Sequence, residues 1–318
     1  MVIHVGFVGL SESWCRRVML AAPPRMLARI MIVATATLAV SCGADDGARI
    51  TVGAGDSLES TVLAEIYANA LARTGARTAV QRDLGERADY LAALDANRVQ
   101  LVAEHTGALL SYFDADADAD ADAGNRTRKP KEVSDAVNGA LPEGLVVSDP
   151  ADGADLRARV LLTEEAATSA DIHKVDDLAP QCATTAVGVL ATTDSIAQPN
   201  TLARDSGCEF AATLEFPDWA TLRKALLDGQ IHAALLNAPT AEATTGLVVL
   251  PDDTYAIPAE NVVALMRKGM LDATQSKKVN YVSGELTTDE LTEMIRRVRD
   301  QHETPATVAN AWLDDHAL

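Results

Sequence analysis

Aromatic residues are scarce in this 318-residue chain, where Phe, Trp and Tyr together make up 4%. Basic residues are also few, because 27 Lys and Arg stand against 46 Asp and Glu and leave a formal net charge of −19. So acidic a surface argues against nucleic acid and anionic membrane as partners. The length allows a sizeable core in one or two domains.

Only four cysteines are present, and no CxxC or other paired metal-binding spacing occurs among them. Two of them, Cys182 and Cys208, follow Cys42 and form an even pair, as expected for a disulfide in an exported protein. Such a disulfide would contribute roughly 3 kcal/mol through the entropy of the unfolded chain. We predict a structural disulfide, no metal site and no cofactor.

Signatures of catalysis are missing as well. The chain contains no Gly-x-Ser-x-Gly, phosphate-binding loop or His-x-x-x-His pattern. Glu104 and His105 are adjacent, so on a strand they point to opposite faces and cannot work as an acid–base pair. We therefore predict that the protein is not an enzyme. The other histidines after residue 105 are scattered: His173, His232, His302 and His316.

The longest apolar run near the N-terminus, Ile30–Val40, has eleven residues and is too short to span a bilayer. Arginines precede it, which is the layout of a signal peptide over residues 1–41. Met19 or Met26 would be a more conventional start, and a start at Met26 would leave residues 1–25 untranslated. The run ends in Leu-Ala-Val-Ser-Cys, which resembles a bacterial lipobox and predicts an extracytoplasmic protein that is lipid-anchored at Cys42. The alternatives are an ordinary signal peptide or a short buried helix.

Apolar runs with strand character alternate with amphipathic helical segments along the rest of the chain. This alternation predicts an α/β fold with a mostly parallel sheet in each of two lobes. The expected strands are 48–52, 78–82, 99–103, 145–147, 160–162, 186–190, 231–236, 247–250 and 261–266. Asp56 followed three residues later by Glu59 looks like a capping box at the start of the first helix.

An alternating Asp-Ala run over residues 114–123 interrupts this pattern. Its carboxylates could suggest calcium binding, yet no glycine or closing Glu follows at the spacing of an ion-binding loop. Dense like charges repel one another and favour a solvated loop, which is our prediction.

Residues 84–110 carry most of the functional information. Leu91 and Leu94 lie on one face of a short predicted helix, and a strand-like run follows. That strand leads to Glu104, His105 and Thr106, and a second amphipathic helix begins directly after them. Ligands of open α/β sheets bind beyond the carboxyl ends of strands, where helix N-terminal N–H groups point.

The stretch LGERADYLAALDANRVQLVAEHTGALL resembles the core block of the glycine betaine/choline/carnitine (osmoprotectant) substrate-binding proteins of ABC importers. Residues 50–60 and 278–284 agree in the same order, so the resemblance covers about 48–318. It implies a monomeric, two-lobed type II periplasmic-binding fold that closes on a small molecule by a hinge and docks on a membrane permease. Lobe 1 would comprise 42–150 and 252–318, and lobe 2 would comprise 151–251.

The resemblance also implies an aromatic cage that holds a quaternary ammonium by cation–π attraction. One cage tyrosine of the family is retained here as Tyr255, and Tyr90 could replace another from a shifted position. At other cage positions this chain has His105, Ala158 and Asn237 in place of tyrosine. These polar replacements and nearby arginines favour a hydroxylated or carboxylated ligand as the alternative to an osmoprotectant. The predicted ligand-binding residues are Asp56, Ser57, Tyr90, Glu104, His105, Thr106, Arg157, Asn237 and Tyr255.

Six of these candidates have a structural alternative. His105 could be a satisfied structural histidine, and Glu104 could pair with Arg87 or Arg98. Asp56 and Ser57 would cap a helix in either case, Tyr255 could pack in the core, and Arg157 could lie on the surface. A further alternative for the whole chain is a sensor or envelope interaction module without transport.

Overall fold

The computed structural model describes residues 49–113, 129–191, 209–237 and 245–318. The predicted signal peptide, Cys42, the Asp-Ala run and Cys208 lie outside these ranges. The leader, the lipid anchor and the Cys182–Cys208 disulfide therefore stay predictions.

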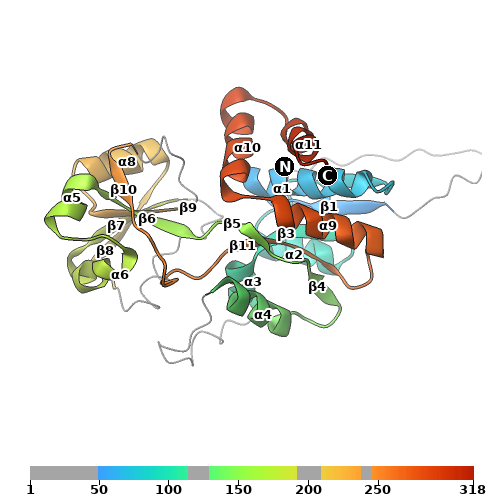
Figure 1. Ribbon diagram of the computed structural model, residues 1–318, viewed down its shortest axis with the longest axis horizontal. Helices are drawn as coiled ribbons and strands as arrows, with labels where there is room; N and C mark the ends of the chain where they lie inside the picture. Colours follow the sequence, from blue (N-terminus) through green and yellow to red (C-terminus); the bar gives the residue numbers. More distant parts are fainter. Residues whose placement is uncertain (1–48, 114–128, 192–208, 238–244) are drawn as a thin grey trace, which may run out of the picture. The chain divides into compact units, whose positions relative to one another are not determined.

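The first sheet, sheet A, is built from strands that come from both ends of the described chain (Figure 1). Its strand order is β2-β1-β3-β11-β4, and β5 also pairs with β11. β1 is parallel to β2 and β3, whereas β11 is antiparallel to β3, β4 and β5. The strands are β1 (Ile50–Gly53), β2 (Thr78–Gln81), β3 (Leu101–His105), β4 (Leu145–Val147), β5 (Ala151–Asp155) and β11 (Asn261–Arg267).

Helices cover both faces of sheet A because its strands are apolar on both sides. One core contains Leu101 and Ala103 of β3 together with buried residues of four helices: α1 (Leu58–Ala72), α9 (Ala273–Glu285), α10 (Thr288–Gln301) and α11 (Pro305–Asp315). The opposite core contains Val102 of β3 and is covered by α2 (Arg87–Asp95), α3 (Thr106–Phe113) and α4 (Pro130–Ala140). Val308 and Trp312 of α11 are buried in the first of these cores.

The second sheet, sheet B, has the order β10-β6-β9-β7-β8. Alternate residues of β6 face its two cores: Val160 and Leu162 pack toward α5, α6 and η1, while Leu161 packs toward α8. The strands are β6 (Ala158–Thr163), β7 (Ala186–Leu190), β8 (Ala212–Phe216), β9 (Ala233–Asn237) and β10 (Leu247–Val249). The helices are α5 (Glu164–Ser169), α6 (Val175–Leu178), the 3₁₀ helix η1 (Ala179–Thr184) and α8 (Trp219–Leu227).

The predicted α/β class with two sheets is confirmed, but both sheets are mixed and not mostly parallel. β11 enters sheet A against the direction of β3, because the chain returns from sheet B at the opposite end of that strand. β6 likewise runs antiparallel to both of its neighbours, β9 and β10. The sequence pattern marked where strands lie, while their direction depends on how the chain crosses between sheets.

The first crossing between sheets lies at residues 156–157, between β5 and β6. β5 was expected in the second lobe, yet it pairs with β11 and so belongs to sheet A. The chain leaves sheet B after β10 and re-enters sheet A at β11, close to the expected return at residue 252. Within the described ranges, no helix combines the length and the apolar character needed to cross a membrane.

Candidate functional site

The loop between β1 and α1 brings polar groups to the edge of sheet A where β3 ends. Ser57 is the N-cap of α1, and its hydroxyl oxygen accepts a hydrogen bond of 3.0 Å from the backbone N–H of Ser60. The expected capping box of Asp56 and Glu59 is therefore wrong, because the helix begins one residue later. Asp56 is exposed and accepts a hydrogen bond of 2.9 Å from the backbone N–H of Gly85.

A pocket lies where the first turn of α1 meets α2 and the end of β3. Its lining includes Ser57, Glu59, Ser60, Arg87, Tyr90 and His105. Three predicted ligand-binding residues are thus brought together here, namely Ser57, Tyr90 and His105. Sequence reasoning did not place Glu59 in the site, because it treated this residue as part of the helix cap.

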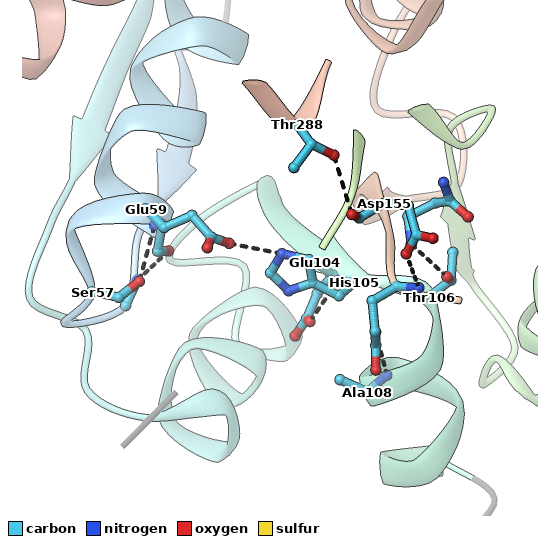
Figure 2. Close-up of polar contacts among 12 residues, drawn as sticks. Ser57, Glu59, Glu104, His105, Thr106, Ala108, Asp155 and Thr288 are labelled. Carbon is cyan, nitrogen blue, oxygen red and sulfur yellow. Dashed lines mark hydrogen bonds and ion pairs between the residues drawn. The ribbon is translucent and has the colours of Figure 1, made fainter. Parts of the chain in front are cut away.

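His105 ends β3 with its imidazole turned toward α1 (Figure 2). Its Nε2 lies 2.8 Å from Oε1 of Glu59 as an ion pair, although this buried nitrogen has no well-aligned hydrogen-bond acceptor among the described residues. Burial alone lowers the pKa of His105, but the carboxylates of Glu59, Glu260 and Glu104 together raise it to about 9. The imidazole is therefore positively charged at neutral pH.

Glu104 points to the other face of β3, as expected for a neighbour of His105 on a strand. Its fully buried carboxylate accepts hydrogen bonds from Nε of Arg87 at 3.1 Å and from the hydroxyl of Tyr90 at 2.8 Å. The predicted pairing of Glu104 with Arg87 is confirmed. Burial lowers the pKa of Arg87, but Glu104 and Tyr90 outweigh this effect and the net pKa is raised. Glu104 thus positions two side chains that line the pocket.

Glu260 is a buried carboxyl group that sequence reasoning missed. Its Oε2 accepts a hydrogen bond of 2.9 Å from the backbone N–H of Ala108 in the first turn of α3. Burial raises the pKa of Glu260 to about 7, although the His105 charge and the Ala108 N–H act in the opposite direction. A Cβ at Gly107 would lie 2.6 Å from Oε1 of Glu260, so the approach requires a glycine.

Thr106 joins α3 to the start of β11 and does not line the pocket. Its Oγ1 donates to the carbonyl oxygen of Ala259 at 3.3 Å and accepts from the backbone N–H of Asn261 at 3.0 Å. Asp155 at the end of β5 binds the same segment, because its Oδ1 accepts from the backbone N–H of Glu260 at 3.1 Å. These contacts fix the end of β3 against the returning chain (Figure 2).

Arg157 connects the two crossings between the sheets. Its Nε lies 2.9 Å from Oδ2 of Asp155, and its Nη1 donates to Oδ2 of Asp252 at 3.2 Å. The guanidinium carbon lies 4.1 Å from the ring centroid of Tyr255. The alternative of Arg157 as a surface residue is wrong, because its side chain is 9% exposed. Tyr255 packs beside the core that holds α2, α3 and α4, with this face covered by Arg157.

Asn237 and Arg159 lie at the end of sheet B that follows the first crossing. Asn237 is paired with Ala158, and its buried Oδ1 accepts no hydrogen bond from the described residues. Arg159 is half-buried, and burial together with the neighbouring Arg157 lowers its pKa. Both side chains thus carry unused hydrogen-bonding capacity within the part of the chain that the structure describes.

The predicted residues consequently fall into separate groups. The pocket is lined by Ser57, Tyr90 and His105. At the crossings between the sheets, Arg157 contacts Tyr255. The end of β3 is held by the hydrogen bonds of Glu104 and Thr106, which do not line the pocket. Among the described residues, no group of His, Cys, Asp and Glu side chains could hold a metal ion.

Two sheets with two chain crossings, and a pocket at the end of a central strand, define the class of type II periplasmic-type binding proteins. A family model described as the substrate-binding domain of ABC-type glycine betaine transport systems matches residues 48–315. The chain belongs to this family and is a solute-binding protein of an ABC importer. A comparison with curated protein sequences found no significant match.

Solved structures agree with the fold. A glycine betaine/carnitine/choline ABC transporter protein shares 18% identity and a TM-score of 0.64, covering 84% of this chain and 98% of that one. Apo YehZ from Escherichia coli shares 17% identity and a TM-score of 0.62, with coverage of 84% and 98%. The glycine betaine/L-proline-binding protein ProX of Borrelia burgdorferi shares 10% identity and a TM-score of 0.53, with coverage of 84% and 93%.

Proposed function

We propose that the protein captures a small osmoprotectant-type solute outside the cytoplasm and presents it, as a monomer, to an ABC permease in the membrane. The observation that carries this proposal is the family match over residues 48–315, joined to a pocket at the end of β3. Glycine betaine, choline and carnitine are the default ligands, because proteins with this fold are named for them. The role is binding and delivery, without catalysis and without a cofactor.

Delivery requires that the protein change shape when it binds its ligand. The two lobes would close on the solute by rotation at the two crossings, with the first boundary moved from the expected residue 151 to residues 156–157 because β5 pairs with β11 in sheet A. The ion pairs of Arg157 with Asp155 and Asp252 support this division, because they connect the two segments that would bend.

A screen of solutes by thermal unfolding tests the proposal directly. A ligand at 100 times its dissociation constant stabilises a protein by about 2.7 kcal/mol. We expect at least one compound among betaine, choline, carnitine, ectoine and proline to raise the unfolding temperature by several degrees. Loss of solute uptake on deletion of the gene, with uptake restored by the unmodified chain, would link binding to transport. A protein stabilised by no small solute would contradict the proposal.

The lipid anchor at Cys42 is proposed from the sequence around it. We expect incorporation of labelled fatty acid into the full chain and its recovery with membranes. The C42S variant should lose both properties while the exported protein remains intact. Equal labelling of the two chains would exclude lipidation at this cysteine.

A hydroxylated or carboxylated ligand is the second candidate, favoured by Asn237 and Arg159. Asn237 has a buried oxygen that accepts no hydrogen bond from the described residues, and the half-buried Arg159 makes no ion pair with them. Sugars, polyols and hydroxy acids therefore belong in the same screen. If this candidate is right, the N237A variant should bind such a ligand at least tenfold more weakly, because a buried polar group of the ligand loses its partner.

A further inference from the structure

The pocket beside β3 presents a carboxylate and hydroxyl groups, and its two cationic side chains, Arg87 and His105, are each paired with a carboxylate, Glu104 and Glu59. Glu59 keeps 25% of its side chain exposed there, and the hydroxyls of Ser57 and Ser60 lie in the same lining. Both hydroxyl oxygens accept backbone hydrogen bonds, from Ser60 and Gly55 respectively, which fixes their positions. The carboxylate of Glu59, a hydrogen-bond acceptor, therefore lies beside two hydroxyl groups with fixed positions at the first turn of α1.

His105 pairs with Glu59 on one side of its carboxylate. The His105 side chain is 11% exposed, and its buried Nε2 has no aligned acceptor within the described chain while lying 2.8 Å from Oε1 of Glu59. This contact engages one oxygen of the carboxylate. No hydrogen bond between described residues engages Oε2, so that oxygen can accept one from a ligand.

Aromatic faces that could hold a methylated ammonium are few around this pocket. Tyr90 lines it, but its hydroxyl is bound to Glu104. Tyr67 is fully buried in the core, and the ring of Tyr255 is covered by Arg157. A cation–π cage needs several ring faces around the cation, and the lining of this pocket contains one tyrosine.

We propose that this pocket binds a protonated amine that donates an N–H hydrogen bond to Glu59, and that Glu59 is the specificity-determining residue for such solutes. Charge-assisted hydrogen bonds of this kind are short and strong, whereas a quaternary ammonium has no N–H to donate. The inference rests on the proposed solute-binding function, and for the same site it replaces the default quaternary ammonium ligands with amines that carry an N–H.

Two series of solutes that differ only in N-methylation test the inference. The first is glycine, sarcosine, dimethylglycine and glycine betaine, and the second runs from ethanolamine through dimethylethanolamine to choline. We expect calorimetric titration of the full chain to show a loss of affinity of at least tenfold between the tertiary and the quaternary member of each series. That step removes the last N–H and one hydrogen bond to a charged group.

Variants of Glu59 connect this selectivity to the residue. E59Q should remove the discrimination between tertiary and quaternary amines, and E293Q on the exposed surface of α10 is the matched control that should retain it. Because E59Q leaves the buried His105 charge without its partner, the E59Q/H105Q double variant provides a second test with a neutral pair. Thermal unfolding of each variant verifies that it is folded.

The outcomes separate this inference from the proposed function. Tightest binding of betaine or choline would overturn the inference and leave the solute-binding function in place. Selectivity for N–H donors that persists in both Glu59 variants would overturn the assignment to Glu59. No binding by either series or by any solute of the wider screen would contradict the proposed function itself.

Discussion

Arg157 covers one face of Tyr255, with its guanidinium carbon 4.1 Å from the ring centroid. The two residues belong to different crossings of the chain between the sheets. Asp155 and Asp252 hold the guanidinium from its other sides, so the cation is fixed on that ring by two carboxylates. An arginine of the protein therefore occupies a position that an organic cation would otherwise take on this tyrosine.

Removing this guanidinium should destabilise the protein. R157M leaves the carboxylate of Asp252, which is 3% exposed, without its cation, and breaking a buried ion pair from one side costs about 3–5 kcal/mol. K131M, which removes an exposed pair with Asp135 on α4, should change the free energy of unfolding by less than about 1 kcal/mol. Urea unfolding of both variants compares the two, and equal small losses would show that the buried contacts contribute little.

Stability should fall as the pH rises from 5 to 10. The folded pKa of Glu260 is raised to about 7 from 4.5, and that of His105 to about 9 from 6.5, so the folded protein binds more protons than the unfolded chain in this range. The contribution of Glu260 is fully present below its unfolded pKa and is lost as the pH passes through 7, and that of His105 is lost through 9. Each amounts to roughly 3 kcal/mol at most.

Unfolding temperatures across this pH range provide the measurement. E260Q should flatten the lower part of the decline, and H105N should flatten the upper part, because each variant removes one of the two titrating groups. H173N replaces an exposed histidine and should leave the profile unchanged. A profile unaffected by E260Q and H105N would show that other groups dominate the pH dependence.

A methyl group at Gly107 should be poorly tolerated. The added Cβ would lie 2.6 Å from Oε1 of Glu260 and 2.9 Å from the carbonyl oxygen of Ala259, and the latter belongs to a backbone that cannot move easily. We expect G107A to cost about 1–3 kcal/mol. G139A in α4 meets nothing within 4 Å and should be neutral or stabilising, by about 0.4–1 kcal/mol. Chemical denaturation of the two variants measures the contrast.

The predicted disulfide can be tested on the protein itself. Cys182 is a buried residue of η1, and Cys208 lies outside the described residues. Mass spectrometry without reductant should identify a Cys182–Cys208 linkage in the exported chain. Reduction should lower its stability by about 2–5 kcal/mol, while the C182A/C208A variant should not respond to reductant. Two free thiols in the exported protein would contradict the prediction.

Local features of the sequence predicted most of the elements. Thr287 and Thr304 are of a residue type that favours helix N-caps, and they are the N-caps of α10 and α11 in the structure. The error at Asp56 arose because Ser57 is an equally good cap, and local propensity cannot choose between neighbours. That choice matters for function, because it decides whether Glu59 satisfies the helix end or faces His105.

The remainder of the site could not be predicted because its contacts join distant segments. Glu260 approaches His105 only because β11 pairs with β3, and the sequence contains no local signal for that pairing. Asp252 and Tyr255 contact Arg157 although all the strands of sheet B lie between them in the sequence. No local signal predicts that contact either. The polar residues at the end of β3 were identifiable, whereas their partners required the topology.

The position of β11 also determines when the protein can fold. This strand lies in the middle of sheet A between β3 and β4, yet it is made after all of sheet B. Until residues 261–267 emerge, the edges of β3 and β4 stay unpaired, and such edges favour aggregation. Pairings between segments so far apart in sequence also form slowly. Late completion fits the export that the predicted leader implies, since sheet A cannot be completed until most of the chain has been made.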